Sequence, residues 1–203
     1  DGRGSNSEAL VFVRGSQPLL VGNTMVGNEG PVISIDINAL NHELLTDYGR
    51  STGLAEPQDQ IVDNQGPLIR DNRLADNEIN GMQVRGGTLS TEGVWDDTDI
   101  THVILDQTIY VADFHTYGGL RLESSGTESL VVKLQGPNAG ITTTGQPLDI
   151  TDRIGGILQI VGQPGYPVVL TSIQDDRVSA GFQPADAPQS DTNTDGHPYQ
   201  EDT

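Results

Sequence analysis

The sequence predicts an all-β chain whose short strands wind into a parallel β-helix, a form of solenoid. Two observations predict this fold. Residues 18–29 (PLLVGNTMVGNE) recur as residues 67–78 (PLIRDNRLADNE), with identities at proline, leucine, two asparagines and glutamate. The chain is also 34% hydrophobic but only 4% aromatic, with 25 glycines in 203 residues. Such a composition suits a solenoid, in which each thin layer buries a few aliphatic side chains against its neighbours.

Each copy of the repeat leads into a strand. Residues 32–36 (VISID) and 81–86 (GMQVRG) alternate along the chain, and a period of two indicates a half-buried strand. Within the repeat, asparagine favours turns and tolerates left-handed backbone. We therefore expect Asn23 and Asn72 to stack at a turn and to hydrogen-bond from one coil to the next.

The two copies lie 49 residues apart (67 minus 18), roughly twice the length of one coil in a fold of this kind. Either another coil lies between the copies or a loop is inserted. Residues 38–65 are rich in Asn, Asp, Gly, Glu and Gln and contain Pro57, which is typical of a loop. We expect an inserted loop there, with a short helical segment at Leu40–Leu45.

Short β-branched runs continue through the second half, separated by Gly, Pro, Asn or Asp, as expected of strands joined by tight corners. An apolar strand is also expected at residues 8–13. Towards the C-terminus the composition becomes acidic and polar, so we assign residues 1–177 to the β-helix and 178–203 to an acidic tail. The strands expected in the second half are Thr101–Leu105, Ile109–Val111, Gly119–Leu122, Leu130–Leu134, Gly140–Thr144, Ile157–Val161 and Val168–Thr171.

The charge of the chain excludes several classes of partner. Ten Lys and Arg stand against 29 Asp and Glu, for a net charge of −19. This field opposes binding to nucleic-acid phosphates or to an anionic membrane surface, and it suits the binding of cations such as calcium.

No apolar run is long enough to span a membrane. The absence of cysteine excludes disulfides and cysteine-ligated metals. Because residue 1 is not Met, we expect a mature or excised piece whose targeting segment lies elsewhere.

The sharpest candidate site is the acidic loop at residues 191–196 (DTNTDG). Alternate oxygen ligands around a glycine turn are the pattern that Ca²⁺ requires. The loop departs from a full EF-hand, because Pro198 follows closely, the last acid is aspartate and no flanking helices are evident. A disordered acidic tail is the alternative. The calcium ligands expected here are Asp191, Asn193, Asp195, the carbonyl of His197, and Asp202.

Two further acidic clusters are candidates for calcium. Asp96, Asp97 and Asp99 form either a calcium loop or a turn with capping aspartates, and the turn is the favoured interpretation. Asp175 and Asp176 are adjacent carboxylates, which repel each other unless a cation or hydrogen-bond donors separate them. They are therefore candidates to bind calcium together with the tail.

Catalysis is not favoured by the residue pattern. The only lysine, Lys133, lies inside a strand-like run, and the arginines are scattered. The four histidines, which are His42, His102, His115 and His197, show no metal-ligand spacing. Nine aromatic residues in all (one Trp, five Tyr and three Phe) are too few for a long platform on which sugars could stack.

Several segments resemble known proteins. Residues 67–87 resemble the right-handed parallel β-helix repeat of pectate-lyase-like folds. Residues 94–100, 115–122, 128–133 and 149–156 resemble segments of very large secreted bacterial proteins that carry such repeats. In those proteins a strand like the one at 167–172 is followed by paired aspartates and an Asp-rich, calcium-type loop. The resemblance implies right-handed winding, a secreted setting and a chain that is part of a longer protein.

The sequence therefore predicts a secreted, calcium-stabilised structural module of a bacterial surface or extracellular-matrix protein. Its expected partners are copies of itself or adjacent repeats of a longer parent chain. Residues 8–13 would add to the open end of another subunit, and non-closing contacts of this kind build filaments. The alternative function is a polysaccharide-binding or polysaccharide-degrading β-helix, such as an adhesin or a lyase.

Overall fold

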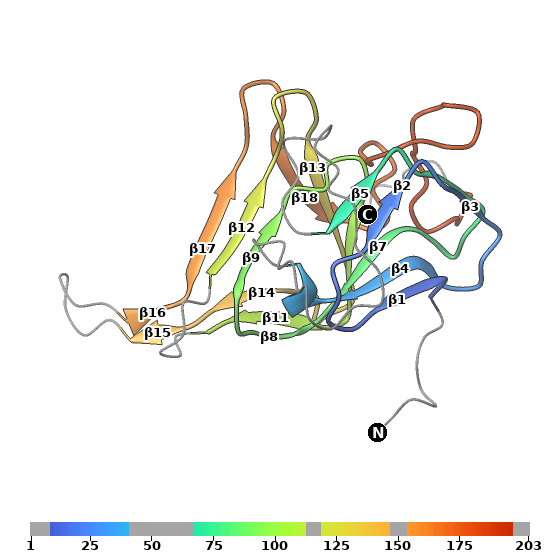
Figure 1. Cartoon of the computed structure of the whole chain (residues 1–203). Helices are drawn as coiled ribbons and strands as arrows, with labels where there is room; N and C mark the ends of the chain where they lie inside the picture. The colour runs from blue at the N-terminus through green and yellow to red at the C-terminus, as the bar shows by residue number, and fades with distance from the viewer. Residues whose placement is uncertain (1–8, 41–66, 113–118, 147–153, 197–203) are drawn as a thin grey trace, which may run out of the picture.

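The computed structural model describes residues 9–40, 67–112, 119–146 and 154–196, and their fold is all-β with mainly parallel strands (Figure 1). The only helical element among them is the 3-10 turn η2, Ile37–Ala39. The strands are β1 Val11–Val13, β2 Leu19–Val21, β3 Thr24–Val26, β4 Pro31–Asp36, β5 Leu68–Arg70, β6 Arg73–Ala75, β7 Ile79–Arg85, β8 Gly87–Leu89, β9 Glu92–Trp95, β10 His102–Leu105, β11 Thr108–Val111, β12 Gly119–Glu123, β13 Leu130–Gln135, β14 Gly140–Thr143, β15 Gly145–Gln146, β16 Ile154–Gly155, β17 Ile157–Val161 and β18 Val168–Ser172.

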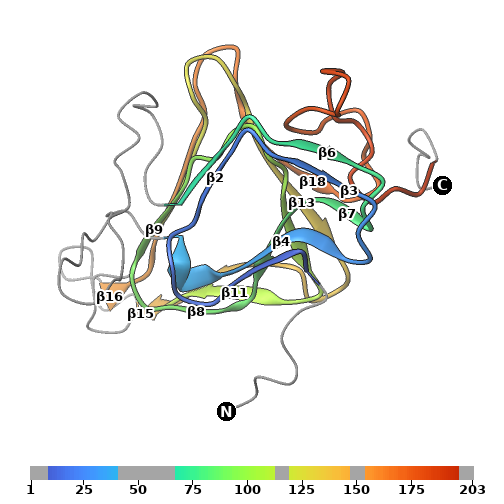
Figure 2. The ribbon, with the colours of Figure 1, turned by 45° about the vertical axis from the view of Figure 1, so that its right-hand side comes forward.

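The chain visits its sheets in rotation. Six parallel strands form one sheet in the order β1-β4-β7-β10-β13-β18, and two three-stranded sheets have the orders β8-β11-β14 and β9-β12-β17. Two-stranded parallel sheets pair β2 with β5 and β3 with β6, and β15 with β16 form a short antiparallel pair. We call the stretch from one strand of the six-stranded sheet to the next a coil. In Figure 2 the strands of successive coils surround a common interior.

The two copies of the sequence repeat pair directly with each other. Leu19 of β2 lies opposite Leu68 of β5, and Met25 of β3 lies opposite Leu74 of β6. No coil therefore lies between the copies. Most of the expected loop and of the expected helical segment falls in residues 41–66, outside the described part of the chain.

Two asparagine pairs join these coils, as the repeat predicted. The side-chain amide of Asn23 donates to Asn72 Oδ1 at 3.0 Å, and that of Asn28 donates to Asn77 Oδ1 at 2.5 Å. The backbone N–H of Asn28 also donates to Asn77 Oδ1, at 3.0 Å. Asn77 is fully buried and donates to the carbonyl of Met25 at 2.9 Å and to Asn80 Oδ1 at 2.9 Å. One side chain thus satisfies several polar groups that water cannot reach.

Aliphatic side chains from all coils fill the interior. Ile33, Met82 and Val132 of the six-stranded sheet are completely buried. Trp95 also lies here, with its ring stacked on that of His102 at 5.2 Å between centroids. Trp95 ends strand β9, which was not among the strands expected from the sequence, and its side chain lies in the core. Burial lowers the pKa of His102 to about 4, so this imidazole is neutral at pH 7.

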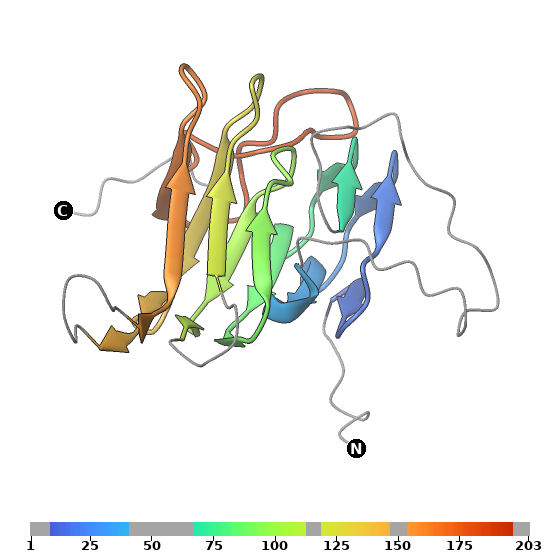
Figure 3. The same ribbon diagram turned by 60° about the vertical axis from the view of Figure 1, so that its left-hand side comes forward.

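A second, smaller apolar cluster lies on the outer face of the six-stranded sheet. It consists of Ile79, Val103 and Ile173, with Leu105 packed against it. Ile173 follows β18 and begins the segment of residues 173–196, which we call the C-terminal segment. The six-stranded sheet is therefore covered on both faces. In Figure 3, β17, β12 and β9 stand side by side on another side of the molecule, and β5 and β2 continue the row.

Replacing Asn77 with alanine should lower the free energy of unfolding by roughly 2–3 kcal/mol, because several buried groups lose their partner at once. Chemical denaturation measures the loss. Asn23→Ala is the matched control, because Asn23 is the exposed donor of the other asparagine pair, with Asn72. This variant should lose under about 1 kcal/mol of unfolding free energy. Equal losses in the two variants would contradict the role assigned to the buried pair.

His102 should make the fold sensitive to acid. Its pKa is about 4 when folded and about 6.5 when unfolded, so the unfolded chain binds more protons between these values. The stability that neutral His102 contributes is complete above pH 6.5 and is lost as the pH falls towards 4. His102→Phe should therefore lose less stability than wild type between pH 7 and pH 4.5, by about 2–3 kcal/mol. Denaturant titrations at both pH values would contradict this if the two proteins lost the same amount.

Candidate calcium site

The C-terminal segment, red in Figures 1 and 2, folds back over β6 and the start of β7. The backbone N–H of Leu74 donates to the carbonyl of Phe182 at 2.9 Å, and that of Asn80 donates to Thr192 at 2.7 Å. The N–H of Ala180 donates to Thr101 Oγ1 at 3.0 Å. The described part of this polar segment is thus held by pairing with residues about a hundred positions earlier in the chain.

Arg73 anchors the middle of this segment. Its guanidinium lies over the ring of Phe182, 4.9 Å from the centroid, and its Nε donates to Asp186 Oδ1 at 2.8 Å. Both partners are on the C-terminal segment, whereas Arg73 begins β6. The contact therefore joins the segment to the repeat.

The C-terminal segment brings together two acidic motifs that are separate in the sequence. Carboxylate oxygens of Asp176, Asp191 and Asp195 lie within 4.8 Å of one another. Burial raises the pKa of Asp176, and the nearby charge of Asp191 raises it further. Of the two candidate residues 175 and 176, Asp176 is the one that lies with the loop of residues 191–196.

Several oxygens in this cluster are buried without a hydrogen bond. Asp176 Oδ1, Asp191 Oδ1 and Asn193 Oδ1 are inaccessible to solvent and accept no hydrogen bond from any described residue. Asn193 donates its side-chain amide to Asp195 Oδ2 at 2.9 Å, and Gly196 N–H donates to Asp191 Oδ2 at 3.2 Å. A buried polar atom without a partner costs free energy. A bound cation would give these three oxygens a partner.

Two asparagines hold the loop of residues 191–196 against the start of β7. Asn80 donates its amide to the carbonyl of Asp191 and to Thr194 Oγ1, each at 3.0 Å. Thr194, which has φ of +52°, donates its hydroxyl to the carbonyl of Asn77. Because Asn77 also belongs to the buried asparagine pair, the candidate loop is joined directly to the stacked coils.

Lys133 is a buried lysine on the face of the sheet that the C-terminal segment covers. In the parallel register it stands between Val103 of β10 and Thr171 of β18, on the outer face of the six-stranded sheet. Its side chain is completely buried, and its Nζ makes no hydrogen bond to any described residue. Burial lowers the pKa of Lys133, while Asp176, Asp175 and Asp191 act to raise it. Spacing in the sequence predicts no role for Lys133, because the aspartates that act on it are about 40 or more residues away.

Asp175 makes its hydrogen bonds outside the cluster of Asp176, Asp191 and Asp195. Arg177 donates to Asp175 through Nε at 2.8 Å and through the second guanidinium nitrogen at 3.2 Å, and Thr171 donates its hydroxyl at 2.7 Å. These hydrogen bonds, led by that of Arg177, hold the pKa of Asp175 well below its usual range. Asp175 is thus a structural carboxylate beside the cluster, and Asp176 is the member of the pair that joins it.

The aspartates that follow Trp95 contact the backbone of the preceding coil. Asp97 Oδ1 accepts from Ile69 N–H at 3.2 Å, and Asp99 Oδ2 accepts from Asp71 N–H at 2.5 Å. Burial raises the pKa of Asp99 to about 6, although the Asp71 N–H and Arg70 act in the opposite direction. At Asp97 and Asp99 this geometry fits the turn with capping aspartates that the sequence favoured.

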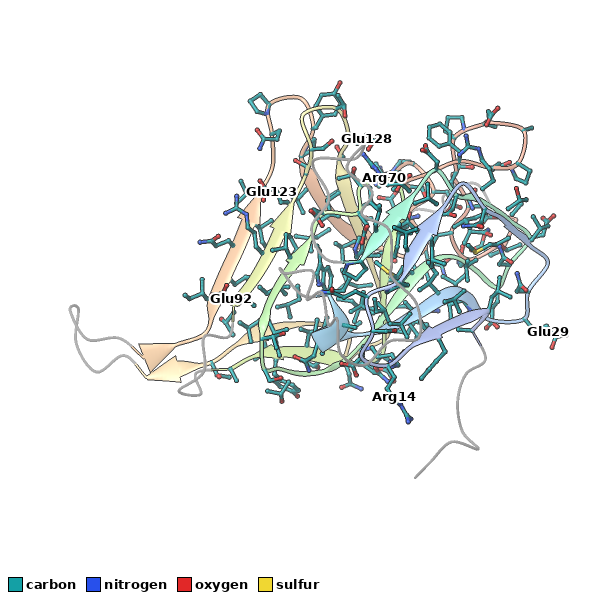
Figure 4. The ribbon with its side chains drawn as sticks, in the orientation of Figure 1. Arg14, Glu29, Arg70, Glu92, Glu123 and Glu128 are labelled. Atoms are coloured by element: carbon teal, nitrogen blue, oxygen red, sulfur yellow. The ribbon has the colours of Figure 1, made fainter. Side chains whose placement is uncertain are left out.

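Arg70 and Glu128 complete this second polar network. Arg70 donates to Glu128 Oε2 at 2.8 Å, and the two side chains lie together in Figure 4. Thr98 donates its hydroxyl to the same oxygen at 2.7 Å. Asp99 lies 3.7 Å from the guanidinium. The network ties β5 to the turn after β9 and to the start of β13, so each member has a structural role.

Two expected calcium ligands, His197 and Asp202, lie outside the described residues. Of the other expected ligands, Asp191, Asn193, Asp195 and Asp176 come together. Sequence reasoning missed Asn80 and Thr194, which position the loop, and Lys133. The lone charged residue in an otherwise apolar strand was the signal that could have drawn attention to Lys133.

The chain has no detected similarity to known proteins, so its function is argued from the fold and the candidate site. No family model matches the chain, and no curated protein or solved structure matches it either. Among the described residues, no helix has both the length and the hydropathy needed to cross a membrane.

Proposed function

We propose that this chain is a segment of a right-handed parallel β-helix and a calcium-stabilised structural module of a secreted bacterial surface or matrix protein. The observation that carries the proposal is the gathering of Asp176, Asp191, Asp195 and Asn193 where the C-terminal segment closes over the six-stranded sheet. The β-helix is supported by the rotation of the chain through parallel sheets. The right-handed winding and the secreted setting rest on the resemblance of the repeat.

The chemistry of the cluster favours calcium. Ca²⁺ takes six to eight hard oxygen ligands from carboxylates, amide oxygens, carbonyls and water. Three carboxylates and the free Oδ1 of Asn193 provide the first of these, and the carbonyl of His197 and Asp202 are the further ligands that the loop pattern predicts. Three carboxylates and one buried lysine leave a local charge of −2 (three negative, one positive), which a divalent cation would balance.

Calcium at this position would stabilise the fold. Asp176 and Asp191 are 15 residues apart (191 minus 176) and bracket the part of the segment that pairs with β6. An ion bound to both would close this stretch into a loop and hold it on the outer apolar cluster. Because the folded chain alone brings the ligands together, binding would add to the free energy of unfolding.

The ends of the described fold support assembly with a second copy. Ile160 continues the buried column of Leu122, and Leu170 continues that of Val132. Their partners are fully buried, yet Ile160 is 46% and Leu170 is 45% exposed. Strand β1 is the opposite edge of the sheet that ends in β18. A second copy that added its β1 beside β18 would cover Leu170 and continue the parallel pairing, and the rest of its first coil would stack over β17 and Ile160. Such a head-to-tail contact builds filaments when it does not close.

The alternative function, polysaccharide binding, finds less support. Among the described residues, the exposed large aromatic side chains are Tyr110 and Tyr166. Tyr110 lies on β11, and Tyr166 precedes β18 in a corner of the chain. They form no row on one face, so a stacking platform for sugars is not evident in this part of the chain.

Calcium should raise the midpoint of thermal unfolding, and a chelator should reverse the effect. At a concentration 100 times the Kd the gain is about 2.7 kcal/mol, or roughly 5–10 °C for a chain of this size. Asp191→Asn and Asp176→Asn should lose the gain. Asp186→Asn is the control, because Asp186 is exposed and pairs with Arg73 outside the cluster. An unchanged midpoint in wild type would contradict the calcium site.

Light scattering in millimolar calcium, repeated after chelation, tests assembly. Wild type should form large particles with calcium and return to small ones without it, since calcium relieves the repulsion between chains of charge −19. Ile160→Lys should stop growth because it places a charge in the contact, and deletion of residues 1–13 should stop it as well. Tyr110→Lys is the matched control, equally exposed but on a side face. Polymers formed by the truncated chain would argue against the end-to-end contact.

A further inference from the structure

Lys133 is the buried charged group that the proposed function leaves unexplained. It is the only lysine of the chain and occupies an outward position of β13, next to Val131, which is also buried. An ammonium group without a hydrogen bond in a buried site is unfavourable, and apolar residues usually fill such places. Something at this position must therefore compensate its charge.

The compensating charges are the carboxylates of the candidate site. Lys133 lies opposite Thr171 in the parallel register, and the Thr171 hydroxyl donates to Asp175, the neighbour of Asp176. The negative charges of Asp176, Asp175, Asp191 and Asp195 act to raise the pKa of Lys133. Asp175 is already engaged by Arg177 and Thr171. The other three form the cluster whose oxygens lie within 4.8 Å of one another. Lys133 Nζ makes no hydrogen bond within the described part of the chain, so it does not occupy the oxygens of the cluster.

We propose that Lys133 is an internal counter-cation that sets the calcium affinity of the Asp176–Asp191–Asp195 site. This inference rests on the proposed calcium site. Without calcium, the ammonium offsets part of the repulsion among the three carboxylates and keeps the C-terminal segment docked. With calcium bound, the same ammonium repels the ion and weakens binding.

The consequence is a site of low affinity that remains folded when it is empty. Calcium sites tuned to extracellular concentrations bind in the 10⁻⁴–10⁻³ M range, and ligand charge is one of the factors that set the affinity. A site with three carboxylates and no opposing charge would bind more tightly, but its ligands would repel one another without the ion. Lys133 therefore lowers the affinity for calcium and stabilises the folded chain when no calcium is bound.

Calorimetric titration of the full chain with calcium chloride, for wild type and Lys133→Met, tests the proposal. The methionine side chain fills a similar volume and removes the charge. Calcium should bind the variant more tightly, on the order of 10- to 100-fold, because a positive charge that repels the ion has been removed from a partly buried site. Arg14→Met is the control for a remote change of charge, since Arg14 lies at the N-terminal side of the molecule in Figure 4, and it should retain the wild-type affinity.

Thermal unfolding with and without calcium gives a second readout. Lys133→Met should unfold at a lower temperature than wild type in chelator, and its gain on adding calcium should exceed that of wild type. A residue with only a packing role would shift the midpoint equally in both conditions. If Lys133→Met does not fold, Lys133→Gln removes the charge while keeping a polar end, and the same two measurements apply.

The outcomes separate this inference from the function on which it rests. Wild-type binding with equal or weaker binding by Lys133→Met would overturn the role of Lys133 and leave the calcium site standing. No binding by either protein would overturn the calcium site and the inference together. Binding by Lys133→Met alone would support the role of Lys133 and contradict calcium as a ligand of the wild-type chain.

Discussion

The structure depends on covering both faces of the six-stranded parallel sheet. The inner face packs against the interior through Ile33, Met82 and Val132, while the outer face carries Val103 and Lys133. A parallel sheet is stable in water when both faces are covered. The C-terminal segment provides the outer cover, and its own polar backbone is satisfied by pairing with Leu74 and Asn80. The candidate site is a result of that arrangement, since the segment carries Asp176 and Asp191 over the sheet.

The buried asparagines link the stacking of the coils to the candidate site. Asn77 joins one coil to the next through Asn28, and through Asn80 and Thr194 it contacts the loop that carries the acidic residues. A change in the docking of the loop therefore acts directly on a fully buried hydrogen-bond network. For this reason a cation bound at the candidate site would stabilise the stacked coils and not the loop alone.

Much of the fold could be predicted from the sequence, because its signals are local. Alternation of apolar side chains gave the strands of the six-stranded sheet, and the repeat gave the direct partners Asn23 and Asn72. Strand β9 was not among the expected strands, because its last residue, Trp95, is followed directly by aspartates. Similarly, the offset of 49 residues left two topologies open until the pairing of Leu19 with Leu68 decided between them.

The candidate site was only partly predictable, for a physical reason. The loop pattern at 191–196 identified Asp191, Asn193 and Asp195 from their spacing alone. The choice of Asp176 over Asp175 depends on Arg177 and Thr171, which engage Asp175. Lys133 is buried because the C-terminal segment returns over β13. Spacing between neighbouring residues in the sequence does not predict that return.

Hydrogen exchange of the Leu74 and Asn80 amides tests the central claim most directly, because both donate to the C-terminal segment. If calcium holds this segment on the sheet, both amides should exchange more slowly with calcium, by on the order of 100-fold at 100 times the Kd. The amide of Leu122, inside the β9-β12-β17 sheet, reports on the rest of the fold and should change less. Exchange of Leu74 and Asn80 that is the same with and without calcium would contradict the account.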